Sequence, residues 1–354
     1  MKKHILFCID TLNDGGAEKV LIEILRNIDA KRYIVDLLII HDYGIYFNKI
    51  PKHINWYLLK DAGDKLSKKY DFEIAFLEGQ ATQFIASRNN NSYKIAWVHT
   101  DLYALHWSKS FYENEAQEEW CYSQMDKIIF VSKQVGISFN KIFTNIRTEQ
   151  QVIYNLIDRE KIRQLSNVYS LEKKKFTLCS IGRLVEQKGY HRLIPILYEL
   201  YLEDYDFEFW IIGEGPQRQE LEDIIKAYEL KHVVRLLGFK ENPFPYLKKA
   251  DVFVQASYVE GFSLALCEAI CLEKPILSTE VSGAYEILYK GMAGLIVKQD
   301  TLSIYKGIKR IIEDENYRKD LSYKASLRSE FFNIDNTMQQ IYNLFNYANQ
   351  YLNN

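Results

Sequence analysis

Short apolar runs recur through the first 160 residues, and polar or glycine-containing loops separate them. Runs of this length between such loops are typical of the buried strands of a parallel sheet. The predicted strands span residues 4–10, 33–40, 54–58, 72–77, 94–98, 128–131 and 151–154. Between residues 17 and 28 the apolar positions follow helical spacing instead. A strand, a glycine-containing loop and a helix in this order predict a doubly wound α/β domain.

The same alternation starts again after a polar stretch, residues 158–175, which we interpret as containing a linker. Further strands are predicted at 176–181, 207–212, 233–237, 252–254 and 275–278, and helices at 217–228, at about 262–272 and from 304 onward. With 354 residues the chain is too long for one ordinary core. We therefore predict two α/β domains, 1–160 and 161–335, and a terminal helix, 336–354, with an apolar stripe.

Composition and charge narrow the classes of function. Lys and Arg number 45 against 47 Asp and Glu, so bulk charge does not indicate a nucleic-acid binder. Apolar runs stay well short of 18 residues, and the first ends at Asp10, so we expect neither a membrane-spanning helix nor a signal peptide. Five cysteines in apolar contexts without a CxxC pair predict reduced, buried thiols. These features favour a cytoplasmic protein.

Charged residues follow two of the predicted strands at the end where sites form in parallel sheets. Arg183 and Lys188 flank the loop after strand 176–181 and suit a diphosphate group, although such a pair is common in any loop. His99 follows strand 94–98 directly, and a structural or surface histidine is its alternative interpretation. Gly15 and Gly16 let the first loop approach a ligand closely, but they would also suit a plain turn.

Residues 260–268 combine an anion-binding turn with an unusual buried acid. Gly261 permits close approach of backbone to a ligand, and Ser263 is a good N-cap for the helix that follows. Such a helix N-terminus attracts anions. Glu268 is surrounded by apolar neighbours, where a carboxylate is costly unless it is hydrogen-bonded. Ribose hydroxyls would satisfy it, and so would a structural partner such as an arginine or a backbone N–H.

Three segments together resemble the retaining GT-B glycosyltransferases of family 4. Glu260–Gly261–Phe262, with Glu268–Ala269 after it, is similar to the two-glutamate motif of that family. GRLVEQKG at 182–189 resembles its diphosphate-binding loop, and GGAE at 15–18 its first strand–helix loop. The resemblance implies two Rossmann-like doubly wound domains facing a central cleft, with the C-terminal helix crossing back to the first domain.

The resemblance also implies roles for individual residues. It implies catalytic roles for His99, Arg183, Lys188 and Glu260. The residues that it implies for donor or nucleotide binding are Gly15, Gly16, Arg183, Lys188, Gly213, Glu214, Gly238, Phe239, Glu260, Gly261, Phe262, Ser263 and Glu268. No cofactor and no metal are implied, and the one DxD-like triplet, 204–206, precedes a strand instead of following one.

The implied reaction moves a sugar from a nucleotide-diphosphate donor, expected to be UDP-linked, to a hydroxyl, with retention at the anomeric carbon. The implied acceptor is a lipid-linked saccharide in bacterial surface polysaccharide assembly. A pattern of apolar and basic residues at 133–147 is typical of a helix that contacts a membrane surface, with packing inside the protein as the alternative. Two other functions stay open: a GT-B nucleotide-sugar 2-epimerase, and a non-catalytic partner subunit.

Overall fold

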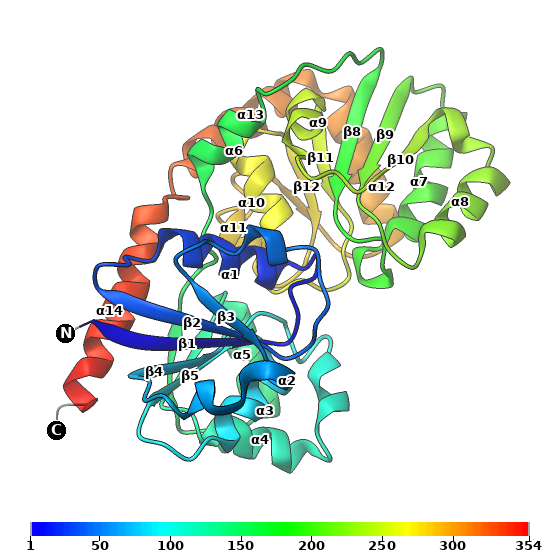
Figure 1. Cartoon of the computed structure of the whole chain (residues 1–354). Coiled ribbons are helices and arrows are strands. Elements are labelled where there is room, and N and C mark those ends of the chain that lie inside the picture. Colours follow the sequence, from blue (N-terminus) through cyan, green and yellow to red (C-terminus); the bar gives the residue numbers. More distant parts are fainter. Residues whose placement is uncertain (1, 353–354) are drawn as a thin grey trace. The chain divides into compact units, whose positions relative to one another are not determined.

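The structure, a computed structural model, describes residues 2–352, with side chains to residue 347 (Figure 1). The chain divides into two compact units. The first comprises Met1–Leu156 and Ile334–Asn354, and the second comprises Ile157–Asn333. The polar stretch 158–175 falls inside the second unit and contains helix α6 (Arg159–Leu165), so the division lies just before the stretch expected to hold the linker.

The first unit is built on a parallel sheet of seven described strands in the order β3-β2-β1-β4-β5-β6-β7. These strands are β1 (Lys3–Ile9), β2 (Tyr33–Ile39), β3 (Asn55–Leu58), β4 (Phe72–Ala75), β5 (Tyr93–Val98), β6 (Lys127–Phe130) and β7 (Glu149–Val152). Its helices are α1 (Gly16–Asn27), α2 (Leu59–Ala62), α3 (Gln80–Ser87), α4 (Glu115–Ser123), α5 (Lys133–Ile142) and α14 (Ile334–Leu352), with short 3-10 turns at Phe47–Lys49, Gly63–Ser67 and Trp107–Phe111.

The predicted doubly wound fold is confirmed in this unit. All seven predicted strands are present, with ends that differ by a few residues. Helices α1 and α3 lie on opposite sides of the sheet (Figure 1). The strand order reverses between β1 and β4, which pair in parallel with Cys8 opposite Ala75. Ligands of open α/β sheets bind beyond the carboxyl ends of the strands at such a reversal.

The last helix, α14, completes the core of the first unit. Its predicted apolar stripe is buried, and the ring of Phe345 lies 5.4 Å from Tyr33 and 5.0 Å from Phe72. Tyr342 stacks on Tyr33 at 5.7 Å, accepts a hydrogen bond from the backbone N–H of Asp29 and donates one to the carbonyl of Asn27. A helix distant in sequence therefore covers strands β2 and β4.

Replacing Phe345 by alanine should destabilise the first unit by about 3–5 kcal/mol, because it leaves a cavity beside two aromatic rings. Denaturant unfolding followed by tryptophan fluorescence measures this loss. Asn336→Ala, an exposed position on the same helix, is the matched control and should unfold within about 0.5 kcal/mol of the unaltered chain. Equal stability of the two variants would contradict the packing of α14 described above.

The second unit is a parallel sheet of six described strands in the order β10-β9-β8-β11-β12-β13. These are β8 (Phe176–Ile181), β9 (Phe207–Ile212), β10 (Val234–Gly238), β11 (Val252–Gln255), β12 (Ile276–Thr279) and β13 (Leu295–Val297). Besides α6, its helices are α7 (Tyr190–Leu202), α8 (Arg218–Ala227), α9 (Phe244–Lys249), α10 (Leu264–Cys271), α11 (Ala284–Ile287), α12 (Thr301–Glu313) and α13 (Glu315–Ser329), with 3-10 turns at Glu186–Lys188 and Leu230–His232. The order reverses between β8 and β11.

Two further expectations concern buried side chains. All five cysteines are free and buried, as predicted.

Helix α5 forms in the stretch expected to contact a membrane, but Phe139 and Phe143 are buried against the ring of Tyr122, at 4.8 and 5.1 Å. Most of that apolar face therefore belongs to the core, and Ile137 stays exposed. Within residues 2–352 we find no helix that combines the length and the hydropathy needed to cross a bilayer.

Candidate active site

At the strand-order reversal of the second unit, two loops touch through their backbones. The loop after β8 leads through Lys188 to Gly189, the N-cap of α7, and the turn after β11 begins at Ala256. Gly189 has φ +66°, and a Cβ at this position would lie 2.3 Å from the carbonyl oxygen of Ala256. Only glycine fits such a contact without a shift of backbone. The two loops that carry the predicted diphosphate residues and Glu260 are thus held together.

Lys188 and Glu260 form an ion pair between these loops. The Nζ of Lys188 lies 2.6 Å from Oε1 of Glu260, and the hydroxyl of Ser257 donates to the same oxygen at 2.7 Å. The side chains are only 25% and 11% exposed, so the pair is shielded from most solvent. Arg183 lies at the start of the first loop and is exposed. Two of the predicted catalytic residues are therefore in direct contact, and a third lies five residues from Lys188.

Arg192 holds the turn after β11 through hydrogen bonds to its backbone. Its Nε donates to the carbonyl of Ala256 at 3.0 Å and its Nη2 to that of Ser257 at 3.2 Å. Its guanidinium also lies over the ring of Tyr258, 3.8 Å from the centroid. Arg192 is not among the residues predicted from the sequence. The available signal was a cation in the first turn of a helix, where the helix dipole disfavours positive charge unless a specific partner is present.

Ser263 caps α10 as predicted. Its hydroxyl oxygen accepts the backbone N–H of Leu266 at 3.3 Å, and the hydroxyl donates to Oε1 of Gln255 at 2.5 Å. The amide of Gln255 in turn donates to the hydroxyl of Ser278 at 3.3 Å. This buried chain of hydrogen bonds fixes the start of α10 and the turn at Gly261 and Phe262 before it. The helix begins four residues after Glu260.

Glu268 lies in the middle of α10 and is 4% exposed. Its neighbours Cys267, Ala269 and Ile270 are completely buried. The predicted burial of this carboxylate is therefore confirmed. Its role toward a ribose stays a prediction.

The predicted nucleobase turns follow β9 and β10. The N–H of Gly213 donates to the carbonyl of Gly238 at 3.0 Å, and a Cβ on Gly213 would lie 2.0 Å from the carbonyl oxygen of Gly182. Glu214 is ion-paired with Arg218 of α8 at 2.6 Å. Phe239 is exposed. The ends of β8, β9 and β10 are therefore brought together, with one aromatic ring on the surface beside them.

In the first unit, two acids follow the strands at the order reversal. Asp10 comes directly after β1, and its Oδ1 accepts the backbone N–H of Ala81 at 2.8 Å. Glu78 comes after β4 and is completely buried; its Oε1 accepts the N–H groups of His99 and Thr100 at 2.7 and 2.6 Å. Its Oε2 is buried without a hydrogen-bond partner. Burial raises the pKa of Asp10 to about 6 and that of Glu78 to about 7.

His99 stands at the end of β5, but its ring turns inward. The ring lies 4.8 Å from the ring of Phe76, and Nε2 is buried without a hydrogen-bond partner. Burial lowers the pKa of His99 to about 3, so the imidazole is neutral at physiological pH. An unpaired buried nitrogen costs stability.

In the first unit, the side chain of Glu18 covers the loop between β1 and α1. Gly15 is the N-cap of α1, and Gly16 begins the helix. A Cβ on Gly15 would lie 2.2 Å from Oε2 of Glu18, and Thr11 donates to Oε1 of Glu18 at 3.4 Å. The side chain of Glu18 therefore folds back over Gly15, and glycine leaves the room that this requires.

Glu78 should make the stability of the first unit depend on pH. Its folded-state pKa, about 7, exceeds its ordinary value of 4.5, so between these values the folded protein holds a proton that the unfolded chain releases. The free energy of unfolding should therefore fall by roughly 3 kcal/mol as the pH rises through this range. Glu78→Gln keeps an acceptor for both N–H groups and should remove most of this fall.

Urea unfolding at pH 5 and pH 8 measures the effect. Asp10 acts in the same direction, so the quantity to compare is the difference between the unaltered chain and the variant. Glu113→Gln, which changes an exposed glutamate, should show the pH dependence of the unaltered chain. If Glu78→Gln behaves in the same way as that control, Glu78 does not carry the buried proton.

Comparison with known proteins gives a family match for part of the chain and a fold for the whole of it. Residues 161–328 match the model described as Glycosyl transferases group 1. A Campylobacter jejuni protein named N-acetylgalactosamine-N,N'-diacetylbacillosaminyl-diphospho-undecaprenol 4-alpha-N-acetylgalactosaminyltransferase is 36% identical over 184 residues, which are 51% of this chain and 49% of that protein. The chain spans about half the length of the first curated relatives that it matches.

Other relatives align with nearly the whole chain. The Campylobacter jejuni protein named GalNAc-alpha-(1->4)-GalNAc-alpha-(1->3)-diNAcBac-PP-undecaprenol alpha-1,4-N-acetyl-D-galactosaminyltransferase is 27% identical over 95% of this chain and 96% of its own. Among solved structures, Anabaena HepE in complex with UDP-glucose has a TM-score of 0.79 at 22% identity, over 97% of this chain and 99% of HepE. Sucrose-phosphate synthase from Thermosynechococcus elongatus has a TM-score of 0.78 at 17% identity, over 98% of each chain. Residues 161–328 therefore resemble the glycosyl transferases group 1 family, and the fold of the chain is that of the GT-B glycosyltransferases.

Proposed function

We propose that this protein transfers a sugar from a UDP-linked donor to a hydroxyl of a lipid-linked saccharide, with retention at the anomeric carbon. The observation that carries the proposal is the shielded ion pair of Lys188 and Glu260 at the carboxyl ends of β8 and β11. In this pair the ammonium of Lys188 suits a leaving diphosphate and the carboxylate of Glu260 suits sugar hydroxyls, and α10 begins four residues after Glu260.

The chemistry requires negative charge to be stabilised on the diphosphate while positive character develops on the sugar. In the reaction the bond from the anomeric carbon to the diphosphate oxygen breaks, and a bond to the acceptor oxygen forms on the same face. The acceptor proton passes to the departing phosphate. Lys188, Arg183 and the N–H groups at the start of α10 offset the charge of that phosphate. Glu260, released from Lys188 by the arriving anion, accepts hydrogen bonds from the sugar.

Related proteins support the proposed donor and acceptor classes. HepE has been solved with UDP and with UDP-glucose. Both Campylobacter jejuni relatives are named for a saccharide that is linked through diphosphate to undecaprenol. A Staphylococcus aureus relative, 28% identical over 177 residues, is named for capsular polysaccharide biosynthesis. We infer an acceptor of the same class, used at the cytoplasmic face of a membrane during surface polysaccharide assembly.

A transfer assay tests the proposal. The full chain is incubated with a panel of UDP-sugars and an undecaprenyl-diphosphate saccharide, and the products are identified by mass spectrometry. The anomeric proton coupling of the product then gives its configuration. We expect an axial glycosidic bond from an axial donor. An epimerised nucleotide sugar without transfer would instead indicate a 2-epimerase, and absence of both transfer and donor hydrolysis would overturn the enzymatic function.

The transfer should need no divalent metal ion. Lys188 and Arg183, together with the helix N-terminus, supply the positive charge that a metal would otherwise bring to the diphosphate. Activity in excess EDTA should therefore stay within about twofold of the activity in buffer without EDTA. Loss of activity in EDTA followed by recovery on addition of Mg²⁺ or Mn²⁺ would show that these groups do not suffice.

A further inference from the structure

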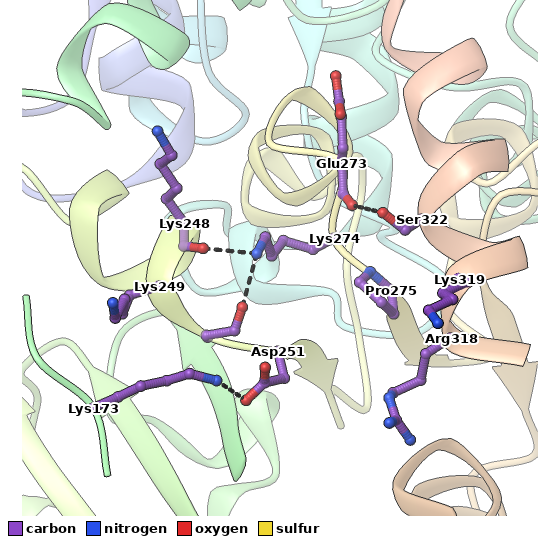
Figure 2. Close-up of a pocket in the computed structure, with 11 residues that line it drawn as sticks. Lys173, Lys248, Lys249, Asp251, Glu273, Lys274, Pro275, Arg318, Lys319 and Ser322 are labelled. Atoms are coloured by element: carbon purple, nitrogen blue, oxygen red, sulfur yellow. Dashed lines mark hydrogen bonds and ion pairs between the residues drawn. The ribbon is translucent and has the colours of Figure 1, made fainter. Parts of the chain in front are cut away.

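A basic hollow lies at the opposite edge of the second sheet from the candidate active site. Lys173, Asp251 and Pro275, which line it, precede β8, β11 and β12 at the amino ends of these strands (Figure 2). Its volume is about 420 Å³ and it is open to solvent. Six of its lining side chains are positive and two are negative, Asp251 and Glu273. The positive ones are Lys173, Lys248, Lys249, Lys274, Arg318 and Lys319.

Part of this charge has a structural explanation. Lys274 donates to the carbonyl oxygens of Lys248 and Ala250, both at 2.7 Å, and so caps the C-terminus of α9 (Figure 2). Lys173 pairs with Asp251. Arg318 donates to the carbonyls of Ile311 and Ile312 at 2.8 and 2.7 Å, which orders the guanidinium without neutralising it.

The remaining positive charge is not balanced. Lys249 has no ion-pair partner within the part of the chain that the structure describes, and Lys319 is paired only with Glu315, on the exposed face of α13. Burial lowers the pKa of Lys274 to about 8 because desolvation disfavours its charged form, and the charges of Lys173 and Lys248 lower it further. An anion in the hollow would relieve this cost.

We propose that this hollow binds a phosphate or diphosphate group. Lysines grouped around a concavity concentrate multivalent anions, because several point charges act on one group at short range. The hollow is separate from the donor-binding residues proposed above, because none of them lines it. The phosphate belongs either to a lipid headgroup or to a compound free in solution, and the experiment distinguishes the two sources.

Side chains beside the hollow allow a test for a lipid source. Tyr323 and Leu327 lie one and two turns after Lys319 on α13 and are 63% and 54% exposed. Residues at this spacing share one helix face. If a headgroup fills the hollow, these two apolar side chains should enter the membrane interface next to it.

The experiment titrates inorganic pyrophosphate into the full chain by calorimetry in the presence of saturating UDP. The hollow variant is Lys249→Glu with Lys319→Glu, and its matched control is Lys226→Glu with Lys231→Glu, the same charge change at two exposed positions of the second unit. We expect equal affinity in the control and the unaltered chain, and affinity at least about tenfold weaker in the hollow variant. Saturating UDP keeps pyrophosphate out of the proposed donor site, whose residues are the same in all of these variants.

Two further readouts sharpen the test. Bound pyrophosphate should raise the pKa of Lys274 above its value in the free protein, measured by NMR of its side chain. Sedimentation with phosphatidylglycerol vesicles, against phosphatidylcholine alone, identifies the source. Vesicle binding that is lost in the hollow variant and weakened by Tyr323→Ser with Leu327→Ser indicates a lipid headgroup. Pyrophosphate binding without vesicle binding indicates a free phosphate compound.

Affinities that are equal in the hollow variant and the control would overturn the proposal. It would also be overturned if neither pyrophosphate nor vesicles bound the unaltered chain. A thermal unfolding scan of each variant confirms that the comparison is made on folded protein. Lys249→Gln with Lys319→Gln replaces the charge reversal if that variant unfolds.

Discussion

Replacing Lys188 by alanine should lower the turnover of sugar transfer by roughly 10²–10³-fold, the usual cost of removing one group that stabilises charge in a transition state. The Nζ of Lys188 is the cation that contacts Glu260, and it lies on the loop that leaves β8 at the strand-order reversal. Its charge should act on the diphosphate as that group departs. Steady-state kinetics with a saturating UDP-sugar measures the loss.

The control for this prediction is Lys226→Ala, which removes an exposed lysine from α8 and should leave turnover unchanged. Lys188→Arg is a second test, because a guanidinium keeps the charge but not the compact shape of an ammonium, so part of the turnover should return. If Lys188→Ala keeps more than about a third of the turnover while it remains folded, the leaving group is stabilised elsewhere.

Replacing His99 by alanine should lower turnover by about a hundredfold while the affinity for UDP stays nearly unchanged. The imidazole belongs to the first unit, whereas the proposed nucleotide residues Arg183, Glu260 and Glu268 belong to the second. Its Nε2 has no hydrogen-bond partner in the described structure but is shielded from solvent, so a substrate hydroxyl can reach it only after the ring turns outward. Because burial lowers the pKa of His99 to about 3, its ionisation should not appear in the pH profile of turnover above pH 5.

A structural role for His99 predicts a different result. Its ring packs on Phe76, so removal would then lower the melting temperature and leave the turnover of each folded molecule intact. Both quantities should be measured on one preparation, with His232→Ala as the control because that histidine is exposed. Retained turnover in His99→Ala would remove His99 from the site.

The strands and the site differ in how far local sequence predicts them. Apolar runs predicted every described strand of the first sheet and all of those of the second except β13, and the cap at Ser263 followed from a local rule. Contacts between distant residues have no local pattern. Lys188 and Glu260 are 72 positions apart, and they meet only because β8 and β11 are neighbours. Glu78 reaches the backbone of His99 for the same reason, since β4 lies beside β5.

The amphipathic stretch around α5 shows a second limit. A helix that packs on a sheet and a helix that lies on a membrane have the same apolar stripe, because each must bury one face. Phe139 and Phe143 are buried in the first unit, and no property of their spacing could have distinguished that partner from lipid. Their ring partners include Tyr122 of α4 and, for Phe139, also Phe130 of β6.

The place of α14 in the first unit has a consequence for the order of events during translation. Ile334–Leu352 is synthesised after every residue of the second unit, so the ribosome can release a complete second unit while the first still lacks one of its helices. Until then Tyr33 and Phe72 lack their aromatic partner Phe345. Nascent chains arrested shortly before residue 334 should therefore expose protease sites in residues 1–156, and those sites should become protected once α14 has emerged from the exit tunnel.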